Sequence, residues 1–356
     1  MSPNTMNSLQ RVTAAFAHES PDRTPVFEYV MQSPIVDYYL NRIYVADPSN
    51  WRQAVSDLGW SAAVRQAACD QVDLAVALGH DIIYTVPSEP IDDVAPTPID
   101  AEEPEDRMAI RVERREAESD LLPAARLEIY PAVAAELRRR GLSIVMMAPT
   151  FTHGVWDDVD LMQTMLLEPE IAHQHFEQCT RRAIALAKFY AETGCKIIGV
   201  GGDFAGNRPL ISPSAYRDFI VPEVRKTSEV CHALGCYAVN ASDGNLWSVI
   251  DDFLVGCDVD GYIEIDQHAG MDLGKLRERF GRTHTFLGNL DCGNTLSFGT
   301  PKDVYQHVQA CLNVGSDVRW GLGGHILTAS NAITASVPIE NYEAVRRAYT
   351  DHLYRL

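Results

Sequence analysis

Acidic and amide side chains lie directly after several short apolar runs of this 356-residue chain. Asp203 follows a run that ends in two glycines, and Asn240, Ser242 and Asp243 lie at the end of the next run. Glu264 is the only acid of a third run. Neighbouring carboxyl groups can divide the roles of proton donor and proton acceptor, and carboxylates also bind divalent metals. These residues therefore indicate acid–base or metal-assisted chemistry.

Each of these residues also has a purely structural interpretation. Asp203 could brace a loop through backbone N–H groups, and Asp243 precedes a glycine, which is a strong turn signal. A lone histidine is more often a hydrogen-bonded structural residue than a ligand, but His325 follows two glycines, and this position favours a functional role as much as a structural one. Both interpretations stay open at the level of the sequence.

The acids and the histidine at the ends of the runs are the expected catalytic groups: Asp203, Glu264 and His325. His153 and Trp156, which follow another run, could line a pocket for an apolar or aromatic substrate. The residues that we expect to bind substrate are Glu28, His153, Asn240, Ser242, Asp243, Asn289 and Asn331.

Eight apolar runs alternate with longer helix-like stretches, and this alternation must position those side chains. Buried parallel strands are continuously apolar because helices cover both faces of the sheet. Eight such units predict an α/β fold of the (β/α)8 TIM-barrel type, whose functional residues lie where the strands end. The predicted strands are residues 24–30, 81–87, 142–149, 195–203, 236–242, 261–265, 283–291 and 317–327.

Helix signals fit the same architecture. An amphipathic opening helix is expected over residues 8–18, and residues 161–193 should hold two helices separated at Pro169. Ser212 and Thr300 each precede a proline, the typical order of a helix cap and first turn. Residues 88–120, polar and then charged, predict an insertion after the second strand. With no linker or repeat, residues 1–356 are expected to form a single domain.

Composition excludes several classes of function. The net charge of −19 and the pI near 4.9 argue against nucleic acid and anionic membranes as partners, since both require basic surfaces. No apolar stretch approaches the roughly 20 residues that span a bilayer, and the N-terminus lacks the features of a secretory signal. We therefore expect a cytoplasmic protein whose eight scattered cysteines are thiols rather than disulfides.

Several segments together resemble the uroporphyrinogen decarboxylase superfamily, which includes cobalamin-dependent methyltransferases of one-carbon metabolism. The matching segments run in order through nearly the whole chain. They are residues 11–26, Pro209-Leu-Ile-Ser-Pro213, Ser242-Asp-Gly-Asn245, Ala269-Gly-Met-Asp272, Gly288-Asn-Leu-Asp291 and Val337-Pro-Ile-Glu-Asn341. The resemblance implies a (β/α)8 barrel, in agreement with the count of apolar runs.

The resemblance is to the methyltransferase-like branch rather than to the true decarboxylases. The decarboxylases carry an arginine-rich segment after the first strand that holds the carboxylates of their substrate. Residues 29–34 contain no arginine here, and the Ser-Asp-Ile that follows the second strand in those enzymes is replaced by residues 84–87. An octa-anionic tetrapyrrole needs guanidinium partners, so this substrate is disfavoured.

Metal binding is the second point of departure from the family. Its zinc-dependent methyltransferases use a His-x-Cys pair after the fifth strand and a cysteine near the end, and those positions are Asn240, Ser242 and Asn331 here. These side chains are poor zinc ligands, so a metal ion would need a harder set rich in oxygen. The candidate ligands are Asp203, Asp243, Glu264, Asp291 and His325.

The function implied by the resemblance is demethylation: movement of a methyl group between a small O-, N- or S-methyl compound and a carrier. The carrier would be a corrinoid, held by a partner protein that docks in part on residues 88–120, or tetrahydrofolate, and zinc or another divalent metal would be the cofactor. A homodimer is also implied. One alternative is a lyase or decarboxylase acting on a small carboxylic acid. The other is a non-catalytic ligand-binding barrel, favoured by the lost ligands Asn240, Ser242 and Asn331.

Overall fold

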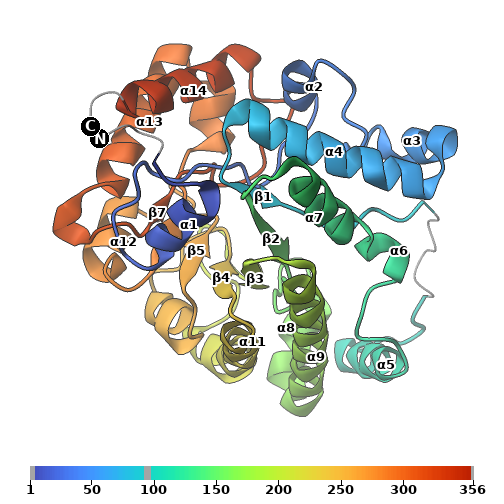
Figure 1. The fold of residues 1–356 in the computed structure, drawn as a ribbon. Coiled ribbons are helices and arrows are strands. Elements are labelled where there is room, and N and C mark those ends of the chain that lie inside the picture. Colours follow the sequence, from blue (N-terminus) through green and yellow to red (C-terminus); the bar gives the residue numbers. More distant parts are fainter. Residues whose placement is uncertain (1–4, 92–97, 354–356) are drawn as a thin grey trace.

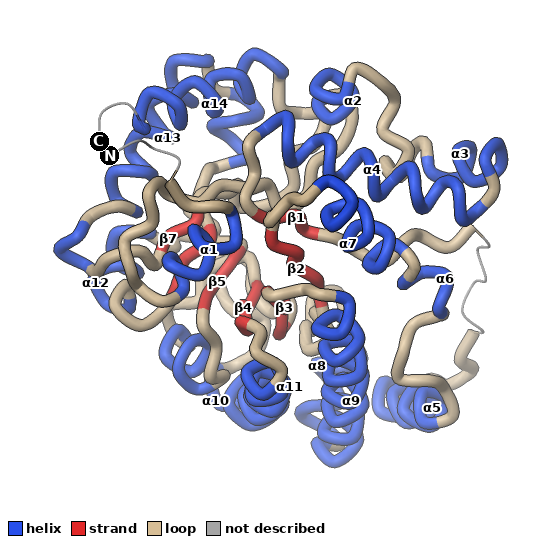
Figure 2. Tube along the Cα trace, viewed as in Figure 1, coloured by secondary structure: helices blue, strands red, loops and turns tan. Residues whose placement is uncertain are grey.

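A curled parallel sheet forms the centre of the protein and helices surround it (Figures 1 and 2). The computed structural model describes residues 5–91 and 98–353. The strands pair in the order of the sequence, each with the next, as expected for successive βα units. They are β1 (Ile82–Tyr84), β2 (Val145–Pro149), β3 (Ile197–Gly201), β4 (Tyr237–Ala241), β5 (Gly261–Ile263), β6 (Thr285–Leu287) and β7 (His325–Ile326).

The sheet has seven strands rather than the predicted eight, because residues 24–30 form no regular strand. This segment lies between the two edges of the sheet: Phe27 N–H donates to the carbonyl of Leu327, and Asp81 N–H donates to the carbonyl of Val26. The next donor along the β7 edge, Ala329 N–H, bonds to the Glu28 carboxylate instead of a backbone carbonyl. The pairing therefore ends after single bridges.

The helices begin and end largely where the sequence predicts. They are α1 (Ser8–Phe16), α2 (Ile35–Leu40), α3 (Trp51–Leu58), α4 (Trp60–Leu78), α5 (Pro104–Glu116), α6 (Ala124–Leu127), α7 (Ile129–Arg140), α8 (Val159–Leu167), α9 (Pro169–Thr193), α10 (Pro213–Ala215), α11 (Val221–Ala233), α12 (Leu273–Phe280), α13 (Pro301–Gly315) and α14 (Ile339–Leu353). Four short helical turns complete the set: η1 (Tyr216–Ile220), η2 (Asp252–Gly256), η3 (Cys292–Leu296) and η4 (Val318–Trp320).

The predicted helix starts are confirmed. Pro169 separates α8 from α9, and the side chain of Ser212 caps α10. Thr300 forms a reciprocal capping box with Asp303 at the start of α13, which satisfies two backbone donors that the helix leaves unpaired. No helix among the described residues is both long enough and apolar enough to cross a membrane.

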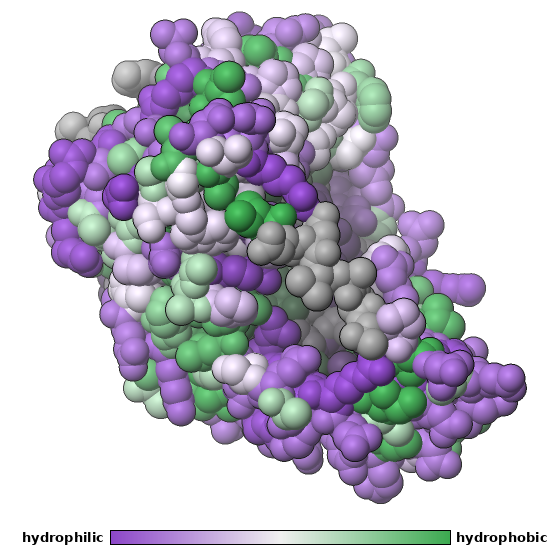
Figure 3. Space-filling view, turned by 90° about the vertical axis from the view of Figure 1, so that its right-hand side faces the viewer, coloured by the Kyte–Doolittle hydropathy of each residue, from purple (hydrophilic) through white to green (hydrophobic). Residues whose placement is uncertain are grey.

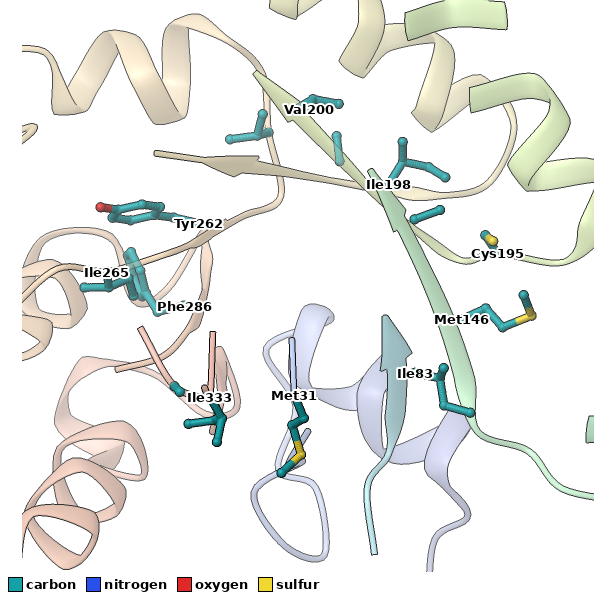
Figure 4. Close-up of a cluster of buried hydrophobic side chains, with 14 of the residues drawn as sticks. Met31, Ile83, Met146, Cys195, Ile198, Val200, Tyr262, Ile265, Phe286 and Ile333 are labelled. Carbon is teal, nitrogen blue, oxygen red and sulfur yellow. The ribbon is translucent and has the colours of Figure 1, made fainter. Parts of the chain in front are cut away.

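Apolar side chains fill both faces of the sheet. Figure 4 shows part of the layer between the strands and the surrounding chain, where Ile83, Met146, Ile198 and Phe286 are labelled. A second cluster fills the space inside the curled sheet, and α1 covers its amino-terminal end, where the ring of Phe16 stacks on Tyr237 with centroids 4.1 Å apart. The carboxyl ends of the strands remain free for a site.

The predicted insertion, residues 88–120, contains α5. This helix packs against α8 and α9 at the edge of the molecule (Figure 1). Arg107 pairs with Asp160 and Arg111 pairs with Asp158, so α5 is attached to α8 by charged side chains. Residues 92–97 of this segment lie outside the described residues. The face that carries α5 and α6 is hollowed (Figure 3).

Candidate active site

Three of the predicted carboxyl groups follow neighbouring strands: Asp203 follows β3, Asp243 follows β4 and Glu264 follows β5. They lie close enough that the charges of Asp203 and Asp243 act on Glu264. The backbone N–H of Asp243 donates a hydrogen bond of 3.0 Å to Oδ1 of Asp203. Parallel strands end at the same edge of their sheet, and this geometry brings together residues 61 positions apart in the sequence.

A cleft of about 490 Å³ opens beside these carboxyl groups. Its lining comes from the loops after β2, β3, β4, β5, β6 and β7, and none of the described lining residues is Lys or Arg. Four aspartates face the same space, so the cleft is strongly acidic. The lining residues are Trp156, Asp203, Ala205, Gly206, Asn207, Asp243, Gly244, Asp266, His268, Asp291, Cys292, Gly293, Asn294, Ser330 and Asn331.

Close backbone packing fixes the loop that carries Asp203. A Cβ added at Gly154 would lie 2.9 Å from both the backbone N and the backbone O of Asp203. On the other side, Gly244 has φ +88° and approaches the carbonyl of Gly206. Only glycine combines such a φ with so close an approach, so these glycines allow the loops after β2, β3 and β4 to pack against one another.

Glu264 is almost fully buried at the base of this group. Its backbone has φ +72°, a left-handed conformation that is uncommon for a residue with a side chain. Burial and the charges of Asp203 and Asp243 raise the pKa of Glu264 well above its usual value, while a hydrogen bond from Tyr29 lowers it in part. The ring of Tyr29 lies 4.3 Å from that of Tyr84, and both rings belong to the cluster inside the sheet. Burial and the neighbouring carboxylates therefore favour the uncharged form of Glu264.

Asp243 lines the cleft and has a pKa close to neutrality. Burial, Asp203 and Asp266 raise the pKa of Asp243 to about 7, and a hydrogen bond from Asn331 opposes this rise. Nδ2 of Asn331 lies 2.7 Å from Oδ2 of Asp243. A carboxyl group that titrates near pH 7 and lines a cleft is suited to donate or accept a proton.

Asp291 has a different environment, although it lines the same cleft. Its carboxylate accepts hydrogen bonds from the backbone N–H groups of Asn294 and Thr295 and from the hydroxyl of Thr295, which together cap η3. His268 lies 2.9 Å from Oδ1 of Asp291. The hydrogen bonds from Thr295 and His268 outweigh burial and lower the pKa of Asp291, so it stays ionised.

His325 is not brought to the cleft. Its Nε2 lies 2.6 Å from the carbonyl oxygen of Gly288 and its ring packs against Gly315 of α13. Burial lowers the pKa of His325 to about 4. Ile326, the next residue of β7, faces the inside of the sheet, so His325 faces the helices.

Four other predicted residues also point elsewhere. Nε2 of His153 contacts the Thr180 hydroxyl of α9 at 2.9 Å, and Nδ2 of Asn240 donates to the carbonyl of Phe253. The structure places Asn289 in a small pocket beside α12 and α13, and Glu28 in a pocket beside α4. Glu28 accepts hydrogen bonds from Tyr342 and Ala329.

The residues at the zinc positions of the family do not fit a zinc ion. Asn240 faces the helix layer, the hydroxyl of Ser242 donates to the carbonyl of Asp243, and Asn331 donates a hydrogen bond to the Asp243 carboxyl group. Within residues 5–91 and 98–353, no three His, Cys, Asp or Glu side chains are arranged to hold a metal ion. Of the predicted metal ligands, Asp203, Asp243 and Asp291 line the cleft, Glu264 lies at its base, and His325 faces the helix layer.

Sequence reasoning missed several residues of this site, among them Tyr29, Asp266 and His268. Tyr29 alternates with Phe27, which also faces the inside of the sheet, so the two-residue period of an extended segment could have indicated it. Asp266 lies two residues after Glu264, just beyond β5. The expectation that Trp156 lines a pocket agrees with the structure, whereas His153 does not line the cleft.

A family model described as uroporphyrinogen decarboxylase (URO-D) matches residues 154–352, more than half of the chain and all of the strands that carry the cleft from β3 onward. The chain belongs to the uroporphyrinogen decarboxylase family. A methylated-thiol–coenzyme M methyltransferase of Methanosarcina mazei is 24% identical over 181 residues, which are 51% of this chain and 45% of the relative. The match thus spans less than half of that relative's length.

A solved structure supports the fold of this uroporphyrinogen decarboxylase family member. A methyltransferase from Methanosarcina mazei superposes with a TM-score of 0.65 and covers 98% of this chain and 99% of its own, at 17% sequence identity. At that identity the likeness establishes the TIM-barrel-like fold.

Proposed function

We propose that this protein is a methyltransferase that moves a methyl group between a small O-, N- or S-methyl compound and a corrinoid or folate carrier. The observation that carries the proposal is the contact between the Asp203 carboxylate and the backbone N–H of Asp243 at the carboxyl end of the sheet. Because the charge of Asp203 helps to raise the pKa of Asp243 to about 7, Asp243 can hold a proton near neutral pH. The methyltransferase relatives of the family support the reaction class.

Asp243 is the proton donor in this reaction. The bond between the methyl carbon and its heteroatom breaks as the carrier's nucleophile bonds to the methyl carbon. The departing alkoxide, amine or thiolate takes the proton from Asp243. Protonation matters most for poor leaving groups such as alkoxides, and general acid catalysis contributes typically 10²- to 10⁴-fold. Asp243 is then regenerated by a proton from solvent.

Asp203 and Asp266 act together with burial to raise the pKa of Asp243. The negative charge of Asp203 disfavours ionisation of Asp243, because two neighbouring carboxylates repel each other. The same two carboxylates and burial favour the uncharged form of Glu264, and in that form Glu264 adds no negative charge to the site. Trp156, which is about half exposed and whose backbone N–H donates to the carbonyl of Asp203, supplies an apolar surface for the methyl compound.

The lining of the cleft restricts the substrate. A cleft with four aspartates and no Lys or Arg among its described lining residues repels a polyanion, so the tetrapyrrole of the decarboxylases is disfavoured. The step described above uses no metal, because the side chains at the family's zinc positions are bonded to other protein groups.

The test is a screen of isotopically labelled methyl compounds with purified protein. Methyl ethers, methylamines and methyl thioethers are the donors, and cob(I)alamin or tetrahydrofolate is the acceptor. We expect labelled methylcobalamin or methyltetrahydrofolate with one class of donor. Failure of every donor with both acceptors would contradict the proposal.

A further inference from the structure

We propose that a second pocket, formed by α5, α9 and the end of β2, binds a small organic carboxylate through Arg115 and Arg182. The pocket has a volume of about 390 Å³ and shares no lining residue with the acidic cleft. It lies on the side of the molecule that carries α5 and α6, the face shown in Figure 3. Its lining residues are Pro87, Arg115, Leu122, Pro149, Thr150, Phe151, Thr152, His175, Gln178, Cys179, Arg182, Leu186 and Tyr190.

Arg182 is a half-buried cation without an anion. Within the described parts of the chain, its guanidinium has no hydrogen-bond or ion-pair partner, unlike that of Arg181, which pairs with Glu116. Burial lowers the pKa of Arg182, and the charge of Arg115 lowers it further. Because a buried charge is costly unless it is paired, this arrangement favours an anion as ligand.

Arg115 lines the same pocket as Arg182 with part of its guanidinium. Its Nη1 donates to Glu118 and to the carbonyl of Ser119, whereas its Nη2 is buried without a hydrogen bond and lies 3.9 Å from Asp120. Glu118 and Asp120 are the acids close to this arginine. Glu118 is largely exposed and Asp120 is partly exposed, so they neutralise the pocket incompletely. In a chain with a net charge of −19, two arginines that face one pocket are a local exception.

Gln178 indicates that the ligand also carries a hydrogen-bond donor. Its Nε2 donates to the carbonyl of Val112 and to Glu116, which fixes the orientation of the amide. Its Oε1 is buried without a donor among the described residues. A buried acceptor left unpaired costs about 1–3 kcal/mol, so a ligand hydroxyl or amine would relieve it.

The apolar residues that line the pocket indicate the shape and polarity of the rest of the ligand. Leu122, Phe151, Leu186 and Tyr190 present apolar or aromatic surface beside the arginines. Guanidinium groups bind carboxylates through two parallel hydrogen bonds, and aromatic walls favour a flat apolar body. The pocket therefore fits a hydroxylated aromatic acid better than a free inorganic anion. The inference stands on this pocket alone and does not depend on the proposed methyl transfer.

Binding of 4-hydroxybenzoate, measured by titration calorimetry at low ionic strength without any methyl donor, tests this inference. We expect saturable binding of one equivalent to the full-length protein. Its neutral analogue 4-hydroxybenzamide and inorganic phosphate should bind at least tenfold more weakly. Arg182→Gln should weaken 4-hydroxybenzoate binding about ten- to hundredfold, because a charge-assisted pair is lost.

Two further variants separate recognition from folding. Arg182→Lys keeps the charge and should retain more affinity than Arg182→Gln. Arg225→Gln on α11 removes a positive charge that pairs with Glu229 and should leave binding unchanged. Equal affinity of wild type and Arg182→Gln, equal binding of acid and amide, tighter binding of phosphate, or no binding by wild type would each overturn the proposal.

Discussion

Asn331 donates a hydrogen bond of 2.7 Å from Nδ2 to Oδ2 of Asp243. The resemblance to zinc-dependent methyltransferases implies a metal ligand at the position of Asn331, and in this chain the side chain contacts a carboxyl group. The hydrogen bond favours the ionised form of Asp243, against burial and the charges of Asp203 and Asp266. The balance of these effects sets the pH at which Asp243 can donate a proton.

The rate of methyl transfer should depend on pH through Asp243. A general acid works only while protonated, so kcat/KM should fall as pH rises through about 7. Asn331→Ala removes a group that lowers the pKa of Asp243, and the alkaline limb should therefore move to higher pH. Initial rates measured from pH 5 to 9 for both proteins check this. An alkaline limb at the same pH in both would show that Asn331 has only a structural role.

Replacement of Glu264 by glutamine should leave both stability and turnover nearly unchanged at pH 7. Burial and the charges of Asp203 and Asp243 favour the uncharged form of Glu264, and Glu264→Gln keeps that form, so it should unfold at nearly the same urea concentration as wild type. Turnover should stay within about twofold of wild type, since Asp243 regains its proton from solvent rather than from Glu264. A variant that is stable but loses turnover would show that Glu264 exchanges a proton during the reaction, and one that unfolds easily would indicate an ionised native carboxylate.

Glu28 should make the free energy of unfolding depend on pH. Burial raises the pKa of Glu28 to about 7 in the folded protein, from about 4.5 when unfolded. The folded state therefore binds more protons between these values, and stability is lost as pH rises through this window, by up to ~3 kcal/mol. Glu28→Gln, which cannot ionise, should lose less stability than wild type between pH 5 and 8. Urea unfolding at both pH values measures the difference, and parallel losses would contradict the assignment.

Gly154→Ala should displace the loop that carries Asp203. The new methyl group would lie 2.9 Å from backbone atoms of Asp203, and the overlap should cost about 1–3 kcal/mol in the free energy of unfolding. Gly293→Ala is the matched control, because nothing lies within 4 Å of its added Cβ. Urea unfolding compares the two variants. Equal stability would show that the loop adapts without strain.

The sequence predicts the alternation of strands and helices well, because apolar runs and helix caps are local signals. It does not predict which face of a strand a polar residue occupies. Both faces of a parallel sheet are apolar, so the pattern around Asn240 and His325 is equally consistent with either orientation, and the structure places both toward the helices. Asp203, Asp243 and Glu264 are predictable because residues just after strands share one edge.

The first predicted strand fails for a specific reason. Residues 24–30 have the composition of a strand, but the Glu28 carboxylate takes the N–H of Ala329 that a regular ladder would use. A contact between positions 301 residues apart leaves no trace in a single sequence. The pocket that Arg115 and Arg182 line is likewise beyond sequence reasoning, since α5 and α9 bring the two arginines together only in the folded chain.

Methyl transfer by wild type and Asp243→Asn, compared at pH 6.5 with the donor identified by the screen, tests the central claim most directly. Asp57→Asn, on the exposed surface of α3, is the matched control. We predict that wild type and Asp57→Asn form the methylated carrier at equal rates and that Asp243→Asn is about 10²-fold slower or more. Equal rates for all three proteins would contradict the assignment of Asp243 as the proton donor.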